Sequence, residues 1–495
     1  MEENDLLQPR EYTTGKHELC FGFGILFIAL ALCNFIFFGG FNLGFAIAAS
    51  LCILCCTGYL LWKGRKLTFY PCAILSLCLI IAASFGRSDD GFVKFVMLCF
   101  LGGGTCLGLC LLAGKQRRNP GSPASLWDVF FVIFRLGFGE LSPAFRGLTA
   151  AFRRSGPAGQ KSTAIVIGLV IAVPLLCVMI PLLMFADAAF EGLMDLLPEF
   201  SVAELFVTVL FGTLLGCLLY AMGTALIHYE DSTPREKKPG RGLACLTINT
   251  VLMAVCLVYA VYLLSQLAYF AGGFSGILPK GYTLAEYARR GFFEIAWLCA
   301  INLGIIGLSL ALSRPKDPAP KSTRLLCLFM ALVTLFLVAT ASAKMFLYID
   351  SYGLTRLRVL TQVVLVFLGL TTCLVAVRLF VPKLPYMKTV VLAGLLLGAL
   401  VSWVDVDSFV AKYNVDAYLA GDLETVDVSH LSVLGDGAVP HIYRLAQEAP
   451  DKAIAHQANA VLGYRWMHDP SDFRGWNYAF HVAGECIAIS KQTDS

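Results

Sequence analysis

The chain has 495 residues, of which 58% are hydrophobic and 15% are charged, and its formal net charge is +4 at pH 7. Soluble domains carry about 25% charged residues, so this composition excludes a soluble protein and predicts an integral membrane protein. The small positive charge follows from basic loops at the ends of membrane helices, so no nucleic-acid partner is implied.

Eleven apolar runs follow one another along the chain. Each is about as long as a transmembrane helix, which needs roughly 20 apolar residues. The runs occupy residues 19–38, 40–62, 68–85, 92–113, 162–186, 204–228, 244–270, 284–312, 325–349, 355–381 and 387–404. The first run is expected to stay as an uncleaved anchor, because its charged leader is not followed by a small-residue cleavage site.

Basic residues alternate from loop to loop. One basic loop lies at 63–66, the segment 115–161 carries eight bases, and further basic loops lie at 235–241, 314–324 and 378–388. By contrast, the loop from Asp187 to Glu204 has five acids and no base. Because cytoplasmic loops concentrate Lys and Arg, this pattern predicts a cytoplasmic N-terminus and an extracytoplasmic C-terminus.

The expected fold class is all-α: a polytopic transmembrane helical bundle of about eleven spans with a small C-terminal extracytoplasmic helical domain. The predicted segments are a cytoplasmic tail at 1–18, an N-terminal membrane bundle of four spans at 19–113, a basic cytoplasmic segment at 114–161, a second membrane bundle of seven spans at 162–404 and the extracytoplasmic helical domain at 405–495.

Within the basic segment, Arg146, Arg153 and Arg154 recur at helical spacing beside an apolar stretch that is too short to cross a membrane. This pattern predicts an interfacial helix whose partners are anionic headgroups. Glycine pairs spaced four residues apart predict close approach of helices in the membrane. The pairs are Gly40 with Gly44, Gly104 with Gly108, Gly212 with Gly216 and Gly394 with Gly398.

The eighteen cysteines and seven histidines do not predict a metal or redox centre. Seventeen of the cysteines lie within or against apolar runs, where a free thiol behaves as a small hydrophobe. Five histidines fall in the segment 405–495, each ten residues or more from the next, and such separations lack metal-ligand spacing. We expect no metal and no cofactor, and the spacing of the residues supplies no catalytic group.

A cluster of charged residues is predicted at the extracytoplasmic ends of the runs 284–312, 325–349 and 355–381. Its bases are Arg289, Arg290, Lys344, Arg356 and Arg358, and its acids are Glu286, Glu294 and Asp350. Two positive charges are left unmatched, and an uncompensated charge at membrane depth is costly. Two interpretations stay open: a pocket for an anionic ligand or lipid headgroup, or three helices joined by mutual ion pairs and snorkelling side chains.

Several stretches of the second half of the chain carry a family resemblance. They are TLAEYARRGFFEIA, SAKMFLYIDSYGLTRLR, VDVDSFVAKYNVDAYLAG and RGWN. Together they resemble a bacterial multi-pass membrane family catalogued as a domain of unknown function, the 4153/4173 group. The resemblance implies a membrane setting and a multi-pass fold, and it implies no known activity, substrate or functional residue.

We expect an integral protein of the bacterial plasma membrane that is non-enzymatic and that transports or handles lipids or anions at the outer face. Its expected partners are membrane lipids, including an anionic lipid headgroup or a phosphate-bearing ligand, and the sequence specifies no protein partner. One alternative is an envelope sensor or scaffold that uses the segment 405–495. Another is a membrane-embedded transferase for a lipid-linked substrate, although the first extracytoplasmic loop, GGFN at 39–42, lacks the acid that such enzymes place there.

Overall fold

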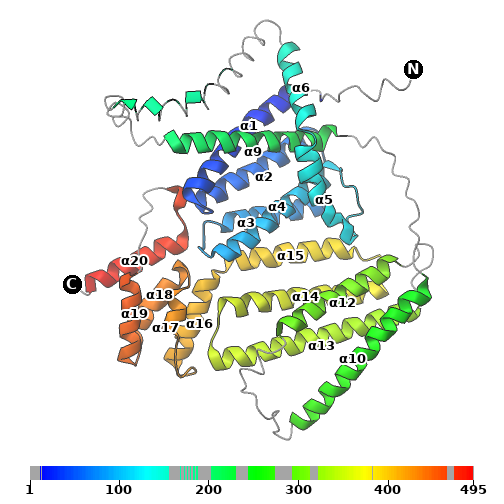
Figure 1. The fold of residues 1–495 in the computed structure, drawn as a ribbon, viewed down its shortest axis with the longest axis vertical. Coiled ribbons are helices and arrows are strands. Elements are labelled where there is room, and N and C mark those ends of the chain that lie inside the picture. The colour runs from blue at the N-terminus through cyan, green and yellow to red at the C-terminus, as the bar shows by residue number, and fades with distance from the viewer. Residues whose placement is uncertain are drawn as a thin grey trace. The chain divides into compact units, whose positions relative to one another are not determined.

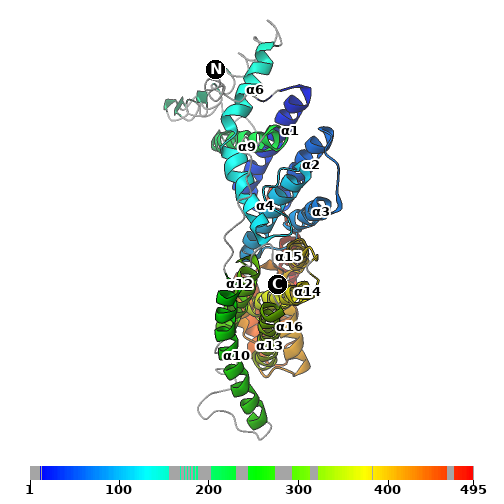
Figure 2. The same cartoon turned by 90° about the vertical axis from the view of Figure 1, so that its right-hand side faces the viewer.

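The computed structural model describes most of the chain, and Figures 1 and 2 show its fold in two views. The described residues are 12, 14–154, 202–229, 244–273, 292–312, 321–381, 383–464 and 473–493, with isolated positions between 168 and 187. Within these ranges every regular element is a helix. This result confirms the predicted all-α class.

Eight helices in the described residues are long and apolar enough to cross a membrane. They are Lys16–Gly39, Leu43–Trp62, Gly91–Ala113, Glu204–His228, Cys245–Ser265, Lys321–Tyr352, Arg356–Phe380 and Tyr386–Trp403. Two other predicted spans, 68–85 and 284–312, contain the shorter apolar helices Phe69–Ser84 and Glu294–Leu310. The remaining predicted span, 162–186, lies almost wholly outside the described residues. The protein is therefore embedded in a membrane by several helices.

The chain divides into two compact units, and unit 1 comprises residues 1–231, 398–405 and 465–495. Its apolar helices are α1 (Lys16–Asn34), which continues into the π-helical turn η2 (Phe35–Gly39), α2 (Leu43–Trp62), α3 (Phe69–Ser84), α4 (Gly91–Ala113) and α9 (Val202–His228). Helix α1 packs against α2 and α9, and α3 packs against α2 and α4. The C-terminal elements η6 (Phe473–Gly475) and α20 (Tyr478–Thr493) belong to the same unit.

Glycines allow α9 to approach α1 closely. A Cβ atom on Gly212 would lie 2.8 Å from the Cα atom of Leu30, and a Cβ atom on Gly216 would lie 2.9 Å from a side-chain carbon of Leu26. Such distances leave no room for a larger residue. The predicted pairing of Gly212 with Gly216 as a helix-packing motif is therefore confirmed.

The basic segment between α4 and α9 contains four short helical pieces. They are η3 (Pro123–Leu126), α5 (Trp127–Phe130), η4 (Phe131–Phe138) and α6 (Leu141–Arg154). The aromatic side chains of Trp127, Phe130, Phe134 and Phe138 are each more than half exposed. Exposed rings beside bases are typical of an element that lies at a membrane interface, and the interfacial position stays a prediction.

Unit 2 comprises residues 232–397 and 406–464. Its apolar helices are α10 (Cys245–Gly273), α12 (Phe292–Leu312), α13 (Lys321–Tyr352), α14 (Arg356–Phe380) and most of α15 (Tyr386–Trp403). Helix α13 packs against α10, α12 and α14. The buried Asn302 side chain joins three of these helices, because it accepts a hydrogen bond from the Tyr259 hydroxyl at 2.8 Å and donates one to the Thr334 hydroxyl at 3.0 Å.

The segment after α15 folds into short helices. They are α16 (Val406–Ala420), α17 (Val428–Ser432), η5 (Asp436–Ala438), α18 (Val439–Glu448) and α19 (Lys452–Tyr464), followed by η6 and α20. The helices α16 to α19 belong to unit 2, whereas η6 and α20 belong to unit 1. Contacts thus divide the segment between the two units, while its extracytoplasmic position and the other predicted segment limits stay predictions.

Candidate functional site

Three segments that are distant in the sequence meet at one end of unit 1, which we name the pocket end. They are the turn between η2 and α2, the loop between α3 and α4, and the C-terminal residues 476–479. The backbone N–H of Leu43 donates to the carbonyl of Trp476 at 3.1 Å, and the N–H of Tyr478 donates to the carbonyl of Gly86 at 2.9 Å. These backbone bonds hold the C-terminal segment against the ends of α2, α3 and α4.

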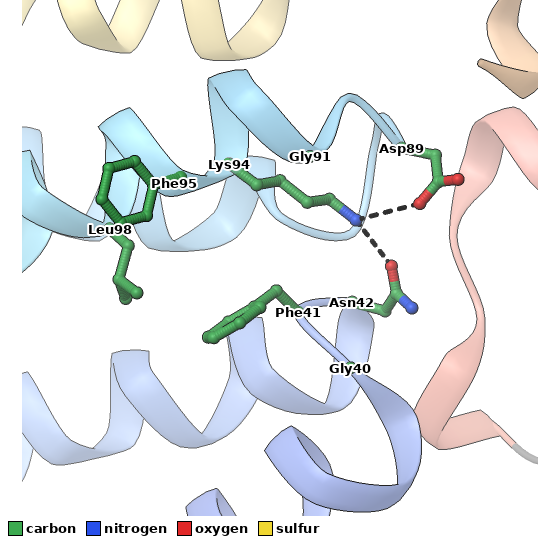
Figure 3. A pocket seen from close by; sticks show the side chains of 8 residues that line it. All are labelled: Gly40, Phe41, Asn42, Asp89, Gly91, Lys94, Phe95 and Leu98. Atoms are coloured by element: carbon green, nitrogen blue, oxygen red, sulfur yellow. Dashed lines mark hydrogen bonds and ion pairs between the residues drawn. The ribbon is translucent and has the colours of Figure 1, made fainter.

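A pocket of about 280 Å³ opens at this end, and its central cation is Lys94 (Figure 3). The Lys94 side chain is only 9% exposed. Its ammonium donates a hydrogen bond to the side-chain oxygen of Asn42 at 2.8 Å and contacts the carboxylate of Asp89 at 3.5 Å. The pocket therefore presents an ammonium, an amide and a carboxylate side by side.

The local sequence explains how Lys94 reaches this position. Asp90 caps α4, because its side chain accepts hydrogen bonds from the backbone N–H groups of Phe92 and Val93, both at 3.0 Å. Lys94 follows in the first turn, and side chains on a helix lean toward its N-terminus, so the ammonium reaches back to the end of the helix. The Asn42 amide is fixed as well, since its nitrogen donates to the carbonyl of Gly39 at 2.8 Å.

The pocket is amphipathic. Figure 3 shows Asn42 and Asp89 at one side of it and the rings of Phe41 and Phe95, with Leu98, at the other side. Phe95 is 64% exposed. Along α4, Phe95 and Leu98 lie farther from the helix start than Lys94, so the apolar side of the pocket continues toward the middle of the predicted span.

Polar residues also lie around the aliphatic part of the Lys94 side chain. Together with Ser84, Ser88 and Ser402, which are all buried, Lys94 lines a second cavity of about 10 Å³. A space of that size in polar surroundings is about what one water molecule needs. The acids whose charges act on Lys94 are Asp89, Asp90 and Asp405, and they offset part of the cost of burying the ammonium.

The opposite end of unit 1 holds another buried charge. The Glu18 carboxylate is buried, forms an ion pair with Lys63, lies 3.2 Å from the ring nitrogen of His228 and accepts the backbone N–H of Gly15 at 2.8 Å. These partners surround the acid, and the network joins α1, α2 and α9. Its role is best explained as structural, because it holds these three helices together.

In unit 2, the predicted base Arg356 has a partner from the segment after α15. Its Nε atom donates to one oxygen of Asp407 at 2.8 Å and its Nη2 atom donates to the other at 2.7 Å. The buried Asp407 carboxylate also accepts the backbone N–H of Gly435 at 2.8 Å. Such a two-pronged ion pair satisfies both charges, so Arg356 connects α14 to α16.

The turn between α13 and α14 is fastened to the same helix. The Asn414 side chain accepts from the backbone N–H of Leu354 at 2.6 Å and donates to the carbonyl of that residue at 2.8 Å. Arg358 donates to the carbonyls of Tyr352 and Gly353, and its guanidinium lies 4.1 Å from the centre of the Tyr348 ring. Both arginines therefore have partners within the chain.

Comparison with known families decides the classification. A family model described as a domain of unknown function, DUF4153, matches residues 24–445. The chain belongs to the DUF4153 family. The match covers most of the chain and confirms the family resemblance seen in the sequence. The family is described as having no known function. Among curated proteins and among solved structures, the comparisons found no match.

In this DUF4153 chain, the other predicted site residues are placed as follows. Lys344 lies half-buried on α13, while Asp350 on α13 and Glu294 on α12 are exposed. Glu286, Arg289 and Arg290 lie outside the described residues. The structure thus joins Arg356 and Arg358 to the turn before α14 and to α16, and the anion-binding role of the predicted cluster stays a prediction.

Three side chains of this DUF4153 chain were not predicted as site residues from the sequence. Lys94 is the single charged residue of the apolar run 92–113, and that isolation is the signal that could have identified it. The second group is Asp407, which stands within a resemblance motif but was not paired with any base. The third is Asn42 in the GGFN loop, and nothing in that short sequence indicates that its side chain meets Lys94.

Proposed function

We propose that this membrane protein binds the phosphate-bearing headgroup of a membrane lipid in the Lys94 pocket, at the extracytoplasmic boundary of the bilayer. The observation that carries the proposal is a buried ammonium in the wall of a pocket that is polar at one side and apolar at the other. The protein would handle the lipid by binding it and would not convert it chemically.

The donor geometry of Lys94 supports a phosphate ligand. An ammonium has three N–H donors, and the contacts to Asn42 and Asp89 use two of them. Within the part of the chain that the structure describes, one donor is thus left for a guest. A charged donor to a phosphate oxygen makes a hydrogen bond about twice as strong as a neutral one.

The orientation of the pocket supports a lipid as the source of that phosphate. A lipid in a bilayer has its headgroup at the surface and its chains toward the middle. The pocket has the same polarity along α4, with Asp89 before the helix and Leu98 two turns into it. The GGFN loop and the loop before α4 are both predicted to be extracytoplasmic by the distribution of bases, which favours the outer leaflet.

The chemistry of the pocket wall favours binding over catalysis. The eight residues that line it include one cation, one carboxylate and one amide, with no Ser, Cys or His among them. Nucleophilic catalysis uses a hydroxyl or thiol beside a base. The proposed role is therefore a binding role, and measured turnover of a lipid-linked substrate would contradict it.

The proposal predicts that Lys94→Gln weakens phospholipid binding. Loss of a charged hydrogen bond costs about 1.5–3 kcal/mol, which corresponds to roughly tenfold or more in the dissociation constant. The measurement is native mass spectrometry of the detergent-purified protein during a phospholipid titration. Lys94→Arg keeps the charge and should retain most of the binding.

Two further variants complete the test. Lys412→Gln removes an exposed lysine of α16, so binding should be unchanged. Phe95→Ala shortens the apolar wall at an exposed position, and it should weaken binding about fivefold even if Lys94→Gln fails to fold. A folded Lys94→Gln protein that binds phospholipid as tightly as the wild type would refute the proposal.

A further inference from the structure

We infer that the Lys94 pocket selects a zwitterionic lipid whose headgroup carries a primary ammonium next to its phosphate, as a phosphoethanolamine headgroup does. This inference rests on the proposed function and adds to it the class of lipid. Its structural basis is the position of Asp89, which lines the same pocket and stands next to Lys94 (Figure 3).

The contact between Lys94 and Asp89 leaves room for a guest. The nitrogen and the carboxylate oxygen are 3.5 Å apart, and the Asp89 side chain is 47% exposed. A closed ion pair is shorter, at about 2.7–2.9 Å. A headgroup with a negative and a positive end can therefore lie against the pair in the opposite direction, with its phosphate at Lys94 and its ammonium at Asp89.

The balance of charge argues against a lipid with a net negative charge. Three acids act on Lys94, namely Asp89, Asp90 and Asp405. The single ammonium of Lys94 therefore faces three carboxylates. A purely anionic headgroup would gain one contact with Lys94 and would meet repulsion from Asp89, because like charges at contact distance repel one another. A zwitterion has no net charge and uses both groups.

The acceptor at the polar side favours a primary ammonium over a quaternary one. The carboxylate of Asp89 is a hydrogen-bond acceptor, and a quaternary ammonium has no N–H to donate to it. Quaternary groups are instead recognised by the faces of aromatic rings. The rings of this pocket, Phe41 and Phe95, lie at its other side from Asp89 (Figure 3).

The test measures lipid selectivity with the full-length protein in detergent. Phosphatidylethanolamine, phosphatidylglycerol and phosphatidylcholine, matched in their acyl chains, are titrated against the wild type, with native mass spectrometry as the readout. We expect the ethanolamine lipid to bind about tenfold more tightly than the other two. Asp89→Asn should remove that preference over the glycerol lipid while phospholipid binding itself persists. Asp422→Asn, at an exposed site in unit 2, should keep the preference.

The outcomes separate this inference from the proposed function. Equal or tighter binding of phosphatidylglycerol by the wild type, or an unchanged preference in Asp89→Asn, would overturn the inference and leave lipid binding standing. Binding of free phosphoethanolamine as tight as that of the lipid would assign the site to a water-soluble group. If none of the three lipids binds the wild type, the proposed function itself is wrong.

Discussion

A single ionisable side chain in an apolar helix shows how much one residue can determine. Lys94 stands in the first turn of α4, where a cation opposes the positive end of the helix dipole. Its burial adds to this cost, and the contacts with Asn42 and Asp89 offset part of it. A residue in so unfavourable a position is retained only where its surroundings or a ligand compensate it, which is why an intramembrane charge marks a candidate site.

Arg356 illustrates the other outcome for a charged residue, in which a partner within the chain compensates it. We predict that Arg356→Gln destabilises the protein by about 3 kcal/mol, because it leaves the buried Asp407 carboxylate without its counter-ion. Thermal unfolding in detergent should show a clear fall in melting temperature. Lipid binding by the folded fraction should be unchanged, since Arg356 does not line the Lys94 pocket.

A matched exposed arginine is the control for this prediction. Arg444 pairs with Asp416 and Glu448 at the surface, where all three side chains are more than 40% exposed. Exposed pairs contribute about 0–1 kcal/mol, so Arg444→Gln should change the melting temperature little. If both substitutions lower the melting temperature equally, the buried pair of Arg356 with Asp407 stabilises the protein no more than an exposed pair does.

The sequence identified the correct neighbourhood of Arg356 but not its partner. The apolar runs place Asp350 near the end of one helix and Arg356 at the start of the next, and the acids predicted as partners, Glu286, Glu294 and Asp350, all lie within or directly after the preceding two runs. Asp407 lies 51 residues farther along the chain. Only the folding of α16 onto the turn before α14 brings it into contact, and no spacing rule encodes such a long-range contact.

At the scale of elements, the attachment of η6 and α20 to the rest of unit 1 depends on a close contact between η6 and Gly39. A Cβ atom on Gly39 would lie 2.6 Å from the backbone carbonyl oxygen of Arg474. The side chain of Arg474 donates to Asn34 at 3.2 Å and to Glu204 at 3.3 Å. The turn η6 therefore sits directly on the ends of α1 and α9, with no space for a larger residue at position 39.

We predict that Gly39→Ala weakens the attachment of η6 and α20. The added methyl group meets backbone rather than a movable side chain, and overpacking of this kind costs about 1–3 kcal/mol. Limited proteolysis of the purified protein should cleave the C-terminal segment faster. Gly58→Ala is the control, because a Cβ atom there meets nothing within 4 Å. Identical digestion of both variants would contradict the prediction.

The helices could be predicted because each depends on its own local sequence. The breaks within a segment and the contacts between distant segments could not. Long apolar runs identified ten of the described or partly described helices, including the 16-residue α3. The breakdown of 114–161 into short pieces was missed, since its aromatic and basic residues fit one amphipathic helix equally well. The approach of η6 to Gly39 was also missed, because RGWN carries no periodic signal.

At the scale of the whole molecule, the two ends of unit 1 bring together different sets of loops. The GGFN loop, the loop before α4 and residues 476–479, all predicted to be extracytoplasmic, meet at the pocket end. Glu204 lies at that end beside Arg474, whereas Gly147 lies against Tyr12 at the other.

Cysteine labelling in intact cells tests this topology. An Asp89→Cys variant should react with a membrane-impermeant maleimide, whereas a Lys66→Cys variant should react only after the cells are opened, because basic loops face the cytoplasm. The wild type gives the background from its own thiols. Labelling of position 66 but not of position 89 in intact cells would reverse the orientation and with it the outer-leaflet position of the pocket.

The attachment of RGWN to the first helices has a consequence for biosynthesis. The ribosome makes α1 and α2 early, yet the carbonyl of Trp476 and the side chain of Asn477 complete their end only when the last residues have been translated and, in the predicted topology, exported. A nascent chain that stops before RGWN would contain all eight of the long apolar helices that the structure describes and still lack this closing contact, so quality control could distinguish it from the finished product.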